Sequence, residues 1–271
     1  DETLRQITSD GASFVELLQR QGIIPGIKVD RGAKPLAGFP GEKITEGLDG
    51  LRERMAEYAA LGARFTKWRA VLALDPQMPS RRGIASNVEA LARFAALSQE
   101  AGLVPVVEPE VLMEGDHPIG RHYDVTEAVL RDLFHELYAH RVRPEAMLLK
   151  VNMILSGTTC PEQADVASVA KATALCMQRT VPAAVPGIVF LSGGQSDVRA
   201  TEHLDALNRL GGVPWQFSFS FGRALQAPAL KAWSGCAANA PGAQAALLHR
   251  ASCNSAARFG QYTAEMEARA V

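Results

Sequence analysis

The feature of this sequence that most constrains its fold is a charged or hydroxyl residue at or just beyond the C-terminal part of most of its six short apolar runs. These polar residues follow one another at intervals of 39, 41, 42, 42 and 31 residues. Runs that are apolar almost throughout are typical of parallel strands buried on both faces. A purely structural strand would keep valine or isoleucine at its end, so the repeated polar ends indicate a shared site. They are Lys28, Lys67, Glu108 with Glu110, Lys150, Ser192 and Arg223.

The runs alternate with stretches in which apolar residues recur at helical spacing, such as Leu51, Met55 and Tyr58. Repeated strand–helix units without a break in composition predict a single α/β domain over residues 1–271. Polar groups at the ends of successive parallel strands meet at one end of a closed barrel, whereas an open sheet spreads them along an edge. We therefore predict a (β/α)8 TIM barrel. The predicted strands are residues 22–29, 65–74, 104–111, 147–153, 187–191 and 215–221.

Only six of the eight strands of such a barrel are identifiable. The 21 residues before the first run allow one short helix, and residues 224–233 and 240–260 have helical patterns. We therefore expect the first two strands of the barrel to be missing from this sequence.

Composition limits the classes of function. Lys plus Arg number 28 against 29 Asp plus Glu, so the net charge of −1 leaves no electrostatic footprint for nucleic acid or an anionic membrane. The apolar runs fall far short of the roughly 20 residues that a membrane-spanning helix needs. The four cysteines are far apart, as is typical of reduced thiols. We expect a soluble cytoplasmic protein with no nucleic-acid or membrane partner.

Lys150 is the most informative of the polar residues because residues 148–153 around it are largely apolar. A buried lysine is costly unless it is paired or deprotonated. A second positive charge, here Lys67, favours the neutral amine, which attacks carbonyl carbons. Alternatively, each lysine lies at a strand end and extends into water. Two lysines at matching strand positions favour the amine nucleophile.

Glu108 and Glu110 are two residues apart on a strand, so both carboxylates point to the same face. One of two close carboxylates can hold a proton near neutral pH, and an imine-forming site needs an acid beside the amine. The alternative is that they balance the lysines in a buried ion network, and both interpretations can hold together.

Two loops in the last two strand–helix units suggest phosphate binding. Residues 192–196 (Ser-Gly-Gly-Gln-Ser) end one strand before a predicted helix, and residues 221–223 (Phe-Gly-Arg) follow the next strand. Glycines let the backbone approach an anion, and N–H groups at a helix start bind phosphate. One such loop alone would be a plain turn, but two of them at these positions of a barrel predict phosphate binding.

Other chemistries find little support in the sequence. It has no His-Glu-x-x-His or Cys/His spacing typical of zinc, and no Gly-x-Gly-x-x-Gly follows the first strand. His135 and His140 are five residues apart and are expected on the surface. We predict no metal and no cofactor.

Taken together, the motifs resemble class I (Schiff-base) fructose-bisphosphate aldolases of bacterial type. The resemblance implies a glycolytic and gluconeogenic lyase that reversibly cleaves fructose 1,6-bisphosphate into dihydroxyacetone phosphate and glyceraldehyde 3-phosphate, and it suggests a homotetramer. The matching stretches occur in family order across essentially the whole chain: residues 26–32, 45–51, 67–69, 107–110, 148–150, 190–196 and 219–226.

The resemblance also implies roles for individual residues. Lys150 would form the imine with the substrate ketone, and Glu108 would be the acid–base group, with Glu110 and Lys67 in the surrounding charge network. The phosphate near the imine would be bound by Ser192, Gly193, Gly222 and Arg223, and the phosphate of the aldehyde half by Lys28 and Arg69.

The sequence departs from the family in two places. Val151 replaces the usual proline after the imine lysine, and nothing matches the family's first strands, one of which carries an acid–base aspartate. Two other functions stay open. One is another imine-forming barrel enzyme, such as a transaldolase or a deoxyribose-phosphate aldolase, although two phosphate sites suit a bisphosphate better. The other is a catalytically silent sugar-phosphate-binding or assembly protein, which would form no reducible imine.

Overall fold

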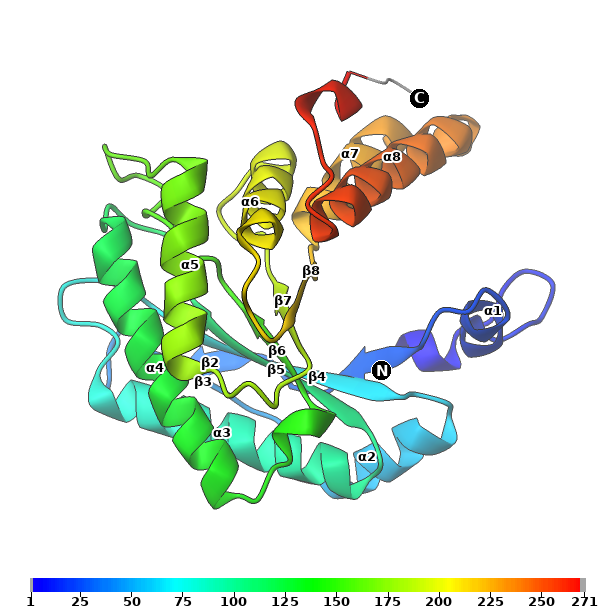
Figure 1. Ribbon diagram of the computed structural model, residues 1–271. Coiled ribbons are helices and arrows are strands. Elements are labelled where there is room, and N and C mark those ends of the chain that lie inside the picture. Colours follow the sequence, from blue (N-terminus) through cyan, green and yellow to red (C-terminus); the bar gives the residue numbers. More distant parts are fainter. Residues whose placement is uncertain (1, 269–271) are drawn as a thin grey trace. The chain divides into compact units, whose positions relative to one another are not determined.

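Residues 2–268 of the chain are described by a computed structural model, in which strands and helices alternate along the sequence (Figure 1). They divide into two units. The first holds the chain up to Val111, together with Ala128–Lys150 and Thr180–Pro186. The second holds Leu112–Glu127, Val151–Arg179 and the chain from Gly187 onward.

Four parallel strands form the sheet of the first unit: β1 (Gly26–Lys28), β4 (Phe65–Leu72), β5 (Val104–Val111) and β6 (Leu148–Val151). They are neighbours in that order. Lys28 of β1 lies opposite Lys67 of β4, and Arg69 of β4 lies opposite Glu108 of β5. Parallel pairing in this register brings the polar residues of successive strands to the same end of the sheet.

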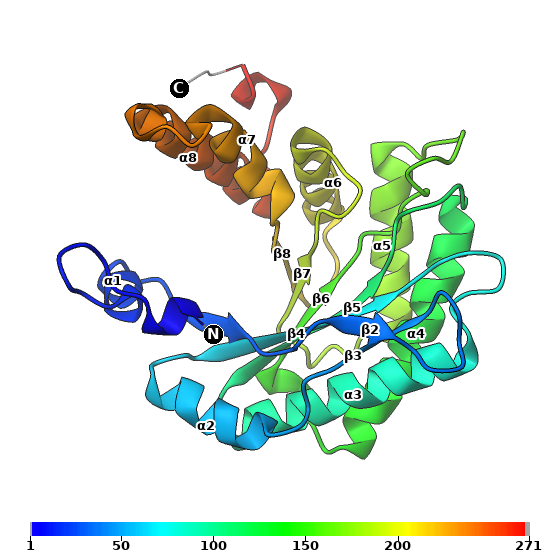
Figure 2. The ribbon, with the colours of Figure 1, turned by 180° about the vertical axis from the view of Figure 1, so that it is seen from behind.

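Helix α3 (Arg81–Glu100) packs across β4 and β5, and α2 (Leu51–Ala60) lies beside it (Figure 2). The Ser80 hydroxyl caps α3 by accepting a hydrogen bond from the Gly83 N–H at 3.0 Å. The apolar face of α3 buries Phe94, whose ring lies 5.7 Å from that of Trp68 in β4. Both side chains are fully shielded from solvent, so their packing fixes β4 against the helix layer.

Three smaller features complete the first unit. Helix α1 (Phe14–Arg20) begins with a capping box between Ser13 and Glu16. Strands β2 (Ala33–Pro35) and β3 (Lys43–Thr45) form an antiparallel pair that the sequence analysis did not predict. Helix α4 (Ile119–Ala139) runs from the second unit into the first.

The second unit contains a parallel pair of strands, β7 (Gly187–Phe190) and β8 (Gln216–Phe219). Helix α8 packs against α6 and α7, and both α6 and α8 contact β8. The helices of this unit are α5 (Val166–Thr180), α6 (Asp197–Leu210), α7 (Arg223–Trp233) and α8 (Ala240–Arg258). Short 3-10 helices in the two units span Glu2–Arg5, Pro144–Ala146, Ala237–Asn239 and Ala264–Met266. Among the residues that the structure describes, no helix is both long enough and apolar enough to cross a bilayer.

All six predicted strands are present as parallel strands, and the predicted C-terminal helices correspond to α7 and α8. The first strand is shorter than predicted. Ile23 and Ile24 are apolar, yet they are 52% and 67% exposed, and pairing with β4 begins only at Gly26. These two apolar residues are therefore not part of the core of the described chain.

Candidate active site

Glu108 of β5 joins two lysines from the neighbouring strands in one cluster. Its Oε1 lies 3.1 Å from Nζ of Lys150 in β6, and its Oε2 lies 2.9 Å from Nζ of Lys67 in β4. The side chain of Glu108 is 3% exposed, against 13% for Lys150 and 22% for Lys67. Two amines therefore share one carboxylate at a place where water screens charges weakly.

The strand register places these three side chains together. Val107 of β5 pairs with Leu149 of β6, which sets Glu108 and Lys150 side by side one residue further along. Lys67 of β4 pairs with Val106, two residues before Glu108, so its side chain is on the same face of the sheet. The predicted convergence of these polar strand ends is confirmed within the first unit.

This arrangement suits imine chemistry. An amine that attacks a ketone forms a carbinolamine, whose hydroxyl leaves as water only when an acid protonates it. The Glu108 carboxyl lies within hydrogen-bond distance of Lys150, close enough to take up and return that proton. The pair therefore has the geometry that carbinolamine formation and dehydration require.

A second charged group adjoins the cluster on β4 and β5. The Arg69 guanidinium forms an ion pair with the Glu110 carboxylate, and this hydrogen bond raises the pKa of Arg69. The backbone N–H of Arg69 donates to Asp30 Oδ2 at 3.1 Å, and Asp30 Oδ1 is paired with Lys28. Asp30, which the sequence analysis assigned no role, thus links the two predicted cations.

Lys28 and Arg69 differ from the buried cluster in their access to solvent. Their side chains are 48% and 43% exposed, so both can meet a solvated anion. Each already has a carboxylate partner, and a phosphate would share the cation with Asp30 or Glu110. Among the ion pairs of the described residues, Glu110 is paired with Arg69 and not with a lysine.

The predicted phosphate loops lie in the second unit. Residues 192–195 form a turn closed by a hydrogen bond from the Gln195 N–H to the Ser192 carbonyl at 3.0 Å. Gly194 has a φ of +77°, and a Cβ there would lie 3.0 Å from the Cβ of Met113. Glycine is therefore required at this position for both its backbone conformation and the close approach. Ser196 caps α6 by accepting from the Arg199 N–H.

A groove of about 460 Å³ joins this loop to the start of α7. Gln195 and Ser196 line one part of it, and Arg223 and Lys231 of α7 line another. Arg223 and Lys231 supply positive charge that suits an anion, and Asp197 at the start of α6 contributes one carboxylate to the same lining. Ser192, Gly193 and Gly222 precede these residues along the chain but do not line the groove.

Three histidines are buried in the second unit: His117, His122 and His203. His203 is 2% exposed, and its Nδ1 lies 2.6 Å from Oε1 of Gln195 in the phosphate loop. Burial, followed by the positive charge of Arg199, lowers the pKa of His203 to about 4. His203 is therefore neutral near pH 7 and holds the loop through Gln195. No sequence pattern marks this contact, since it joins a side chain within α6 to one in the loop that precedes the helix.

Comparison with known proteins bears on what these groups do. The chain matches the family described as fructose-bisphosphate aldolase class-I over residues 1–271. It is 55% identical over 263 residues to a probable fructose-bisphosphate aldolase class 1 of Xanthomonas campestris pv. campestris, covering 97% of this chain and 79% of that protein. It is 52% identical over 264 residues to cytosolic fructose-bisphosphate aldolase 5 of Arabidopsis thaliana, covering 97% of this chain and 74% of that protein.

A solved structure agrees with the sequence matches. The fructose-bisphosphate aldolase of Plasmodium falciparum, crystallised with TRAP and a small-molecule inhibitor, aligns with a TM-score of 0.95 at 44% identity. The alignment covers 97% of this chain and 76% of that chain.

Proposed function

Because this chain belongs to the class I fructose-bisphosphate aldolase family, we propose that Lys150 is its imine-forming lysine and that Glu108 transfers protons beside it. The reaction of the family is the reversible cleavage of fructose 1,6-bisphosphate into dihydroxyacetone phosphate and glyceraldehyde 3-phosphate through a lysine Schiff base. The fold is the α/β barrel of the family, which explains why its polar residues follow parallel strands.

The proposed steps follow from the positions of the two groups. The Lys150 amine attacks the ketone carbon of the substrate, and Glu108 delivers a proton to the hydroxyl that leaves as water. Glu108, which gave up its proton in that step, then takes the proton of the hydroxyl on the aldehyde half; the carbon–carbon bond breaks and its electron pair moves into the protonated imine, so the aldehyde departs and an enamine stays on Lys150. Lys67 shares the Glu108 carboxylate with Lys150.

The phosphates of the substrate bind to residues other than the Lys150–Glu108 pair. Ser192, Gly193, Gly222 and Arg223 bind the phosphate of the ketone half. Of these four, Arg223 is supported by the groove that it shares with Gln195 and Ser196. Lys28 and Arg69 meet the phosphate of the aldehyde half, supported by their exposure to solvent. A chain that binds both phosphates discriminates against sugars that carry one.

The observation that carries this proposal is the position of Glu108 between Lys150 and Lys67. Glu108→Gln keeps the size of the side chain and an acceptor oxygen, but the amide cannot relay a proton. We expect kcat for fructose 1,6-bisphosphate cleavage to fall about 100- to 10,000-fold. Glu145→Gln, at an exposed glutamate in the Pro144–Ala146 helix, is the matched control and should leave kcat unchanged.

The experiment must distinguish loss of catalysis from loss of the folded state. Thermal unfolding of each variant reports whether the fold is retained, and the rate of adduct formation on borohydride reduction reports imine formation. Both kcat and the trapping rate should fall in Glu108→Gln. A folded Glu108→Gln enzyme with wild-type kcat refutes the role given to Glu108.

Family membership also leads to a proposal for assembly and location, a homotetramer in the cytoplasm. The Arabidopsis thaliana relative is named as cytosolic, which supports the second part for this chain. Sedimentation velocity measures the mass in solution, and a monomer or dimer at micromolar concentration would contradict the first part.

A further inference from the structure

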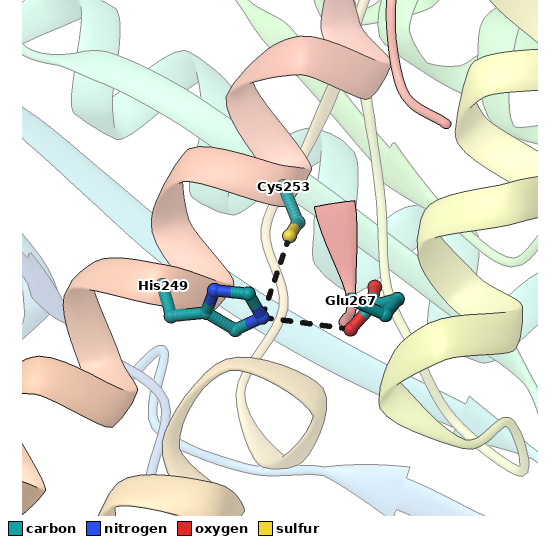
Figure 3. A group of neighbouring side chains, drawn as sticks. All are labelled: His249, Cys253 and Glu267. Atoms are coloured by element: carbon teal, nitrogen blue, oxygen red, sulfur yellow. Dashed lines mark hydrogen bonds and ion pairs between the residues drawn. The ribbon is translucent and has the colours of Figure 1, made fainter. Parts of the chain in front are cut away.

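Helix α8 and the segment that follows it bring three metal-ligating side chains together, and none of the three is among the residues proposed for aldol chemistry. His249 and Cys253 lie four residues apart on α8, so they share one helical face. Glu267 comes from the chain beyond the 3-10 helix Ala264–Met266. Figure 3 shows the three side chains pointing toward one another from these two segments.

The distances fit a small divalent ion. His249 Nε2 lies 3.8 Å from Cys253 Sγ and 3.7 Å from Glu267 Oε2, and the three ligand atoms all lie within 4.8 Å of one another. Tetrahedral zinc with ordinary bond lengths separates sulfur from nitrogen by about 3.6 Å and nitrogen from oxygen by about 3.4 Å. The two observed separations of 3.8 Å and 3.7 Å exceed these values by about 0.2 and 0.3 Å.

The carboxylate is oriented by two further groups. Tyr262 donates its hydroxyl proton to Glu267 Oε1 at 2.9 Å, and Arg250 donates to Oε2. A carboxylate has about four acceptor positions, so these two bonds leave room for a metal. Burial acts to raise the pKa of Glu267, but the hydrogen bonds from Arg250 and Tyr262 outweigh it and lower the pKa. Glu267 is therefore an anion at neutral pH, held in place as metal ligands commonly are.

The site combines a buried sulfur with accessible nitrogen and oxygen ligands. Cys253 is 1% exposed, whereas the side chains of His249 and Glu267 are 20% and 23% exposed. Burial is the main reason that the pKa of the Cys253 thiol is raised, so the free thiol keeps its proton at neutral pH. An ion entering from solvent displaces that proton to water as the sulfur binds, and one water completes the coordination.

We propose that His249, Cys253 and Glu267 bind one Zn²⁺ ion that ties the segment after α8 to this helix. Thiolate, imidazole and carboxylate are the ligand set that zinc takes in proteins, and three protein ligands leave a fourth position for water. The ion connects residues 249 and 267 across the turn between them. It is independent of the imine chemistry assigned to the first unit.

The test uses zinc alone as the probe and does not depend on aldolase activity. After equilibrium dialysis against Zn²⁺ and then a weak chelator, metal analysis should find about one zinc per chain in the wild type. Thermal unfolding should shift upward by about 5 °C at zinc concentrations near 100 times Kd. Cobalt in place of zinc should give the near-ultraviolet absorption band of a thiolate ligand.

Matched variants decide the outcome. Cys253→Ser should lose the zinc, the thermal shift and the cobalt band, whereas Cys236→Ser, at an exposed cysteine between α7 and α8, should keep all three. His249→Gln changes a partly exposed side chain and should also lose the zinc, which covers the case that Cys253→Ser fails to fold. Absence of retained zinc in the wild type, or equal retention in His249→Gln, overturns the proposal.

Discussion

His203 makes the stability of the second unit depend on pH in a way that can be calculated. This histidine on α6 is 2% exposed, and its Nδ1 contacts Gln195 of the loop proposed to bind phosphate. Burial and the charge of Arg199 lower its pKa from 6.5 to about 4 in the folded protein. The folded protein therefore resists a proton that the unfolded chain accepts below pH 6.5.

This difference in pKa makes the folded protein less stable at low pH than at neutral pH. The stabilising contribution is fully present above pH 6.5, and it is lost as pH falls toward the folded pKa near 4, because the unfolded chain binds the extra proton. Between pH 7 and pH 5 the loss amounts to about 2 kcal/mol, and near pH 4 it approaches about 3 kcal/mol.

His203→Asn isolates the effect, because the amide can keep the hydrogen bond to Gln195 but does not titrate. Urea unfolding at pH 7 and pH 5 gives the free energy of unfolding for both proteins. The loss of stability between the two pH values should be about 2 kcal/mol greater in the wild type than in the variant. Equal losses in the two proteins would refute the role given to His203, since other titrating groups contribute to both.

Two further predictions concern the phosphate groove and the core. Arg223→Ala should raise KM for fructose 1,6-bisphosphate roughly 10- to 100-fold in steady-state assays, because a charge-assisted hydrogen bond to phosphate is lost. Arg258→Ala, which removes a guanidinium lying over the Phe259 ring, is the control. Equal changes in KM for the two variants would contradict the role given to Arg223. Phe94→Ala should lower the free energy of unfolding by about 3–5 kcal/mol, because a fully buried ring that packs on Trp68 is removed. Urea unfolding measures this loss, and a loss below about 1 kcal/mol would show that the core around Trp68 collapses without cost.

The active-site cluster was predictable because it depends on strand pairing alone. Val104–Val111 was predicted residue for residue, and parallel pairing then set Lys67, Glu108 and Lys150 on one face. Alternation along a strand and register between strands are both readable from the spacing of polar residues in apolar runs.

Other features depend on contacts that spacing does not encode. Asp30 lies two residues beyond β1, where the register of β1 with β4 brings it opposite Arg69, and its side chain accepts from the Arg69 N–H, a contact that no apolar pattern marks. Strands β2 and β3 have three residues each and mostly exposed or half-exposed side chains, so they lack an apolar pattern. The group of His249, Cys253 and Glu267 could not be predicted either, because Glu267 comes from the segment after α8 and no sequence spacing links it to the helix.

The identity of the imine-forming lysine is the central claim, and one measurement tests it directly. The protein is incubated with dihydroxyacetone phosphate, reduced with borohydride, digested and mapped by mass spectrometry, with Lys150→Met as the control. The wild type should carry one adduct on the peptide containing Lys150, and Lys150→Met should carry none. An adduct on Lys67, or none on the wild-type protein, would contradict the account.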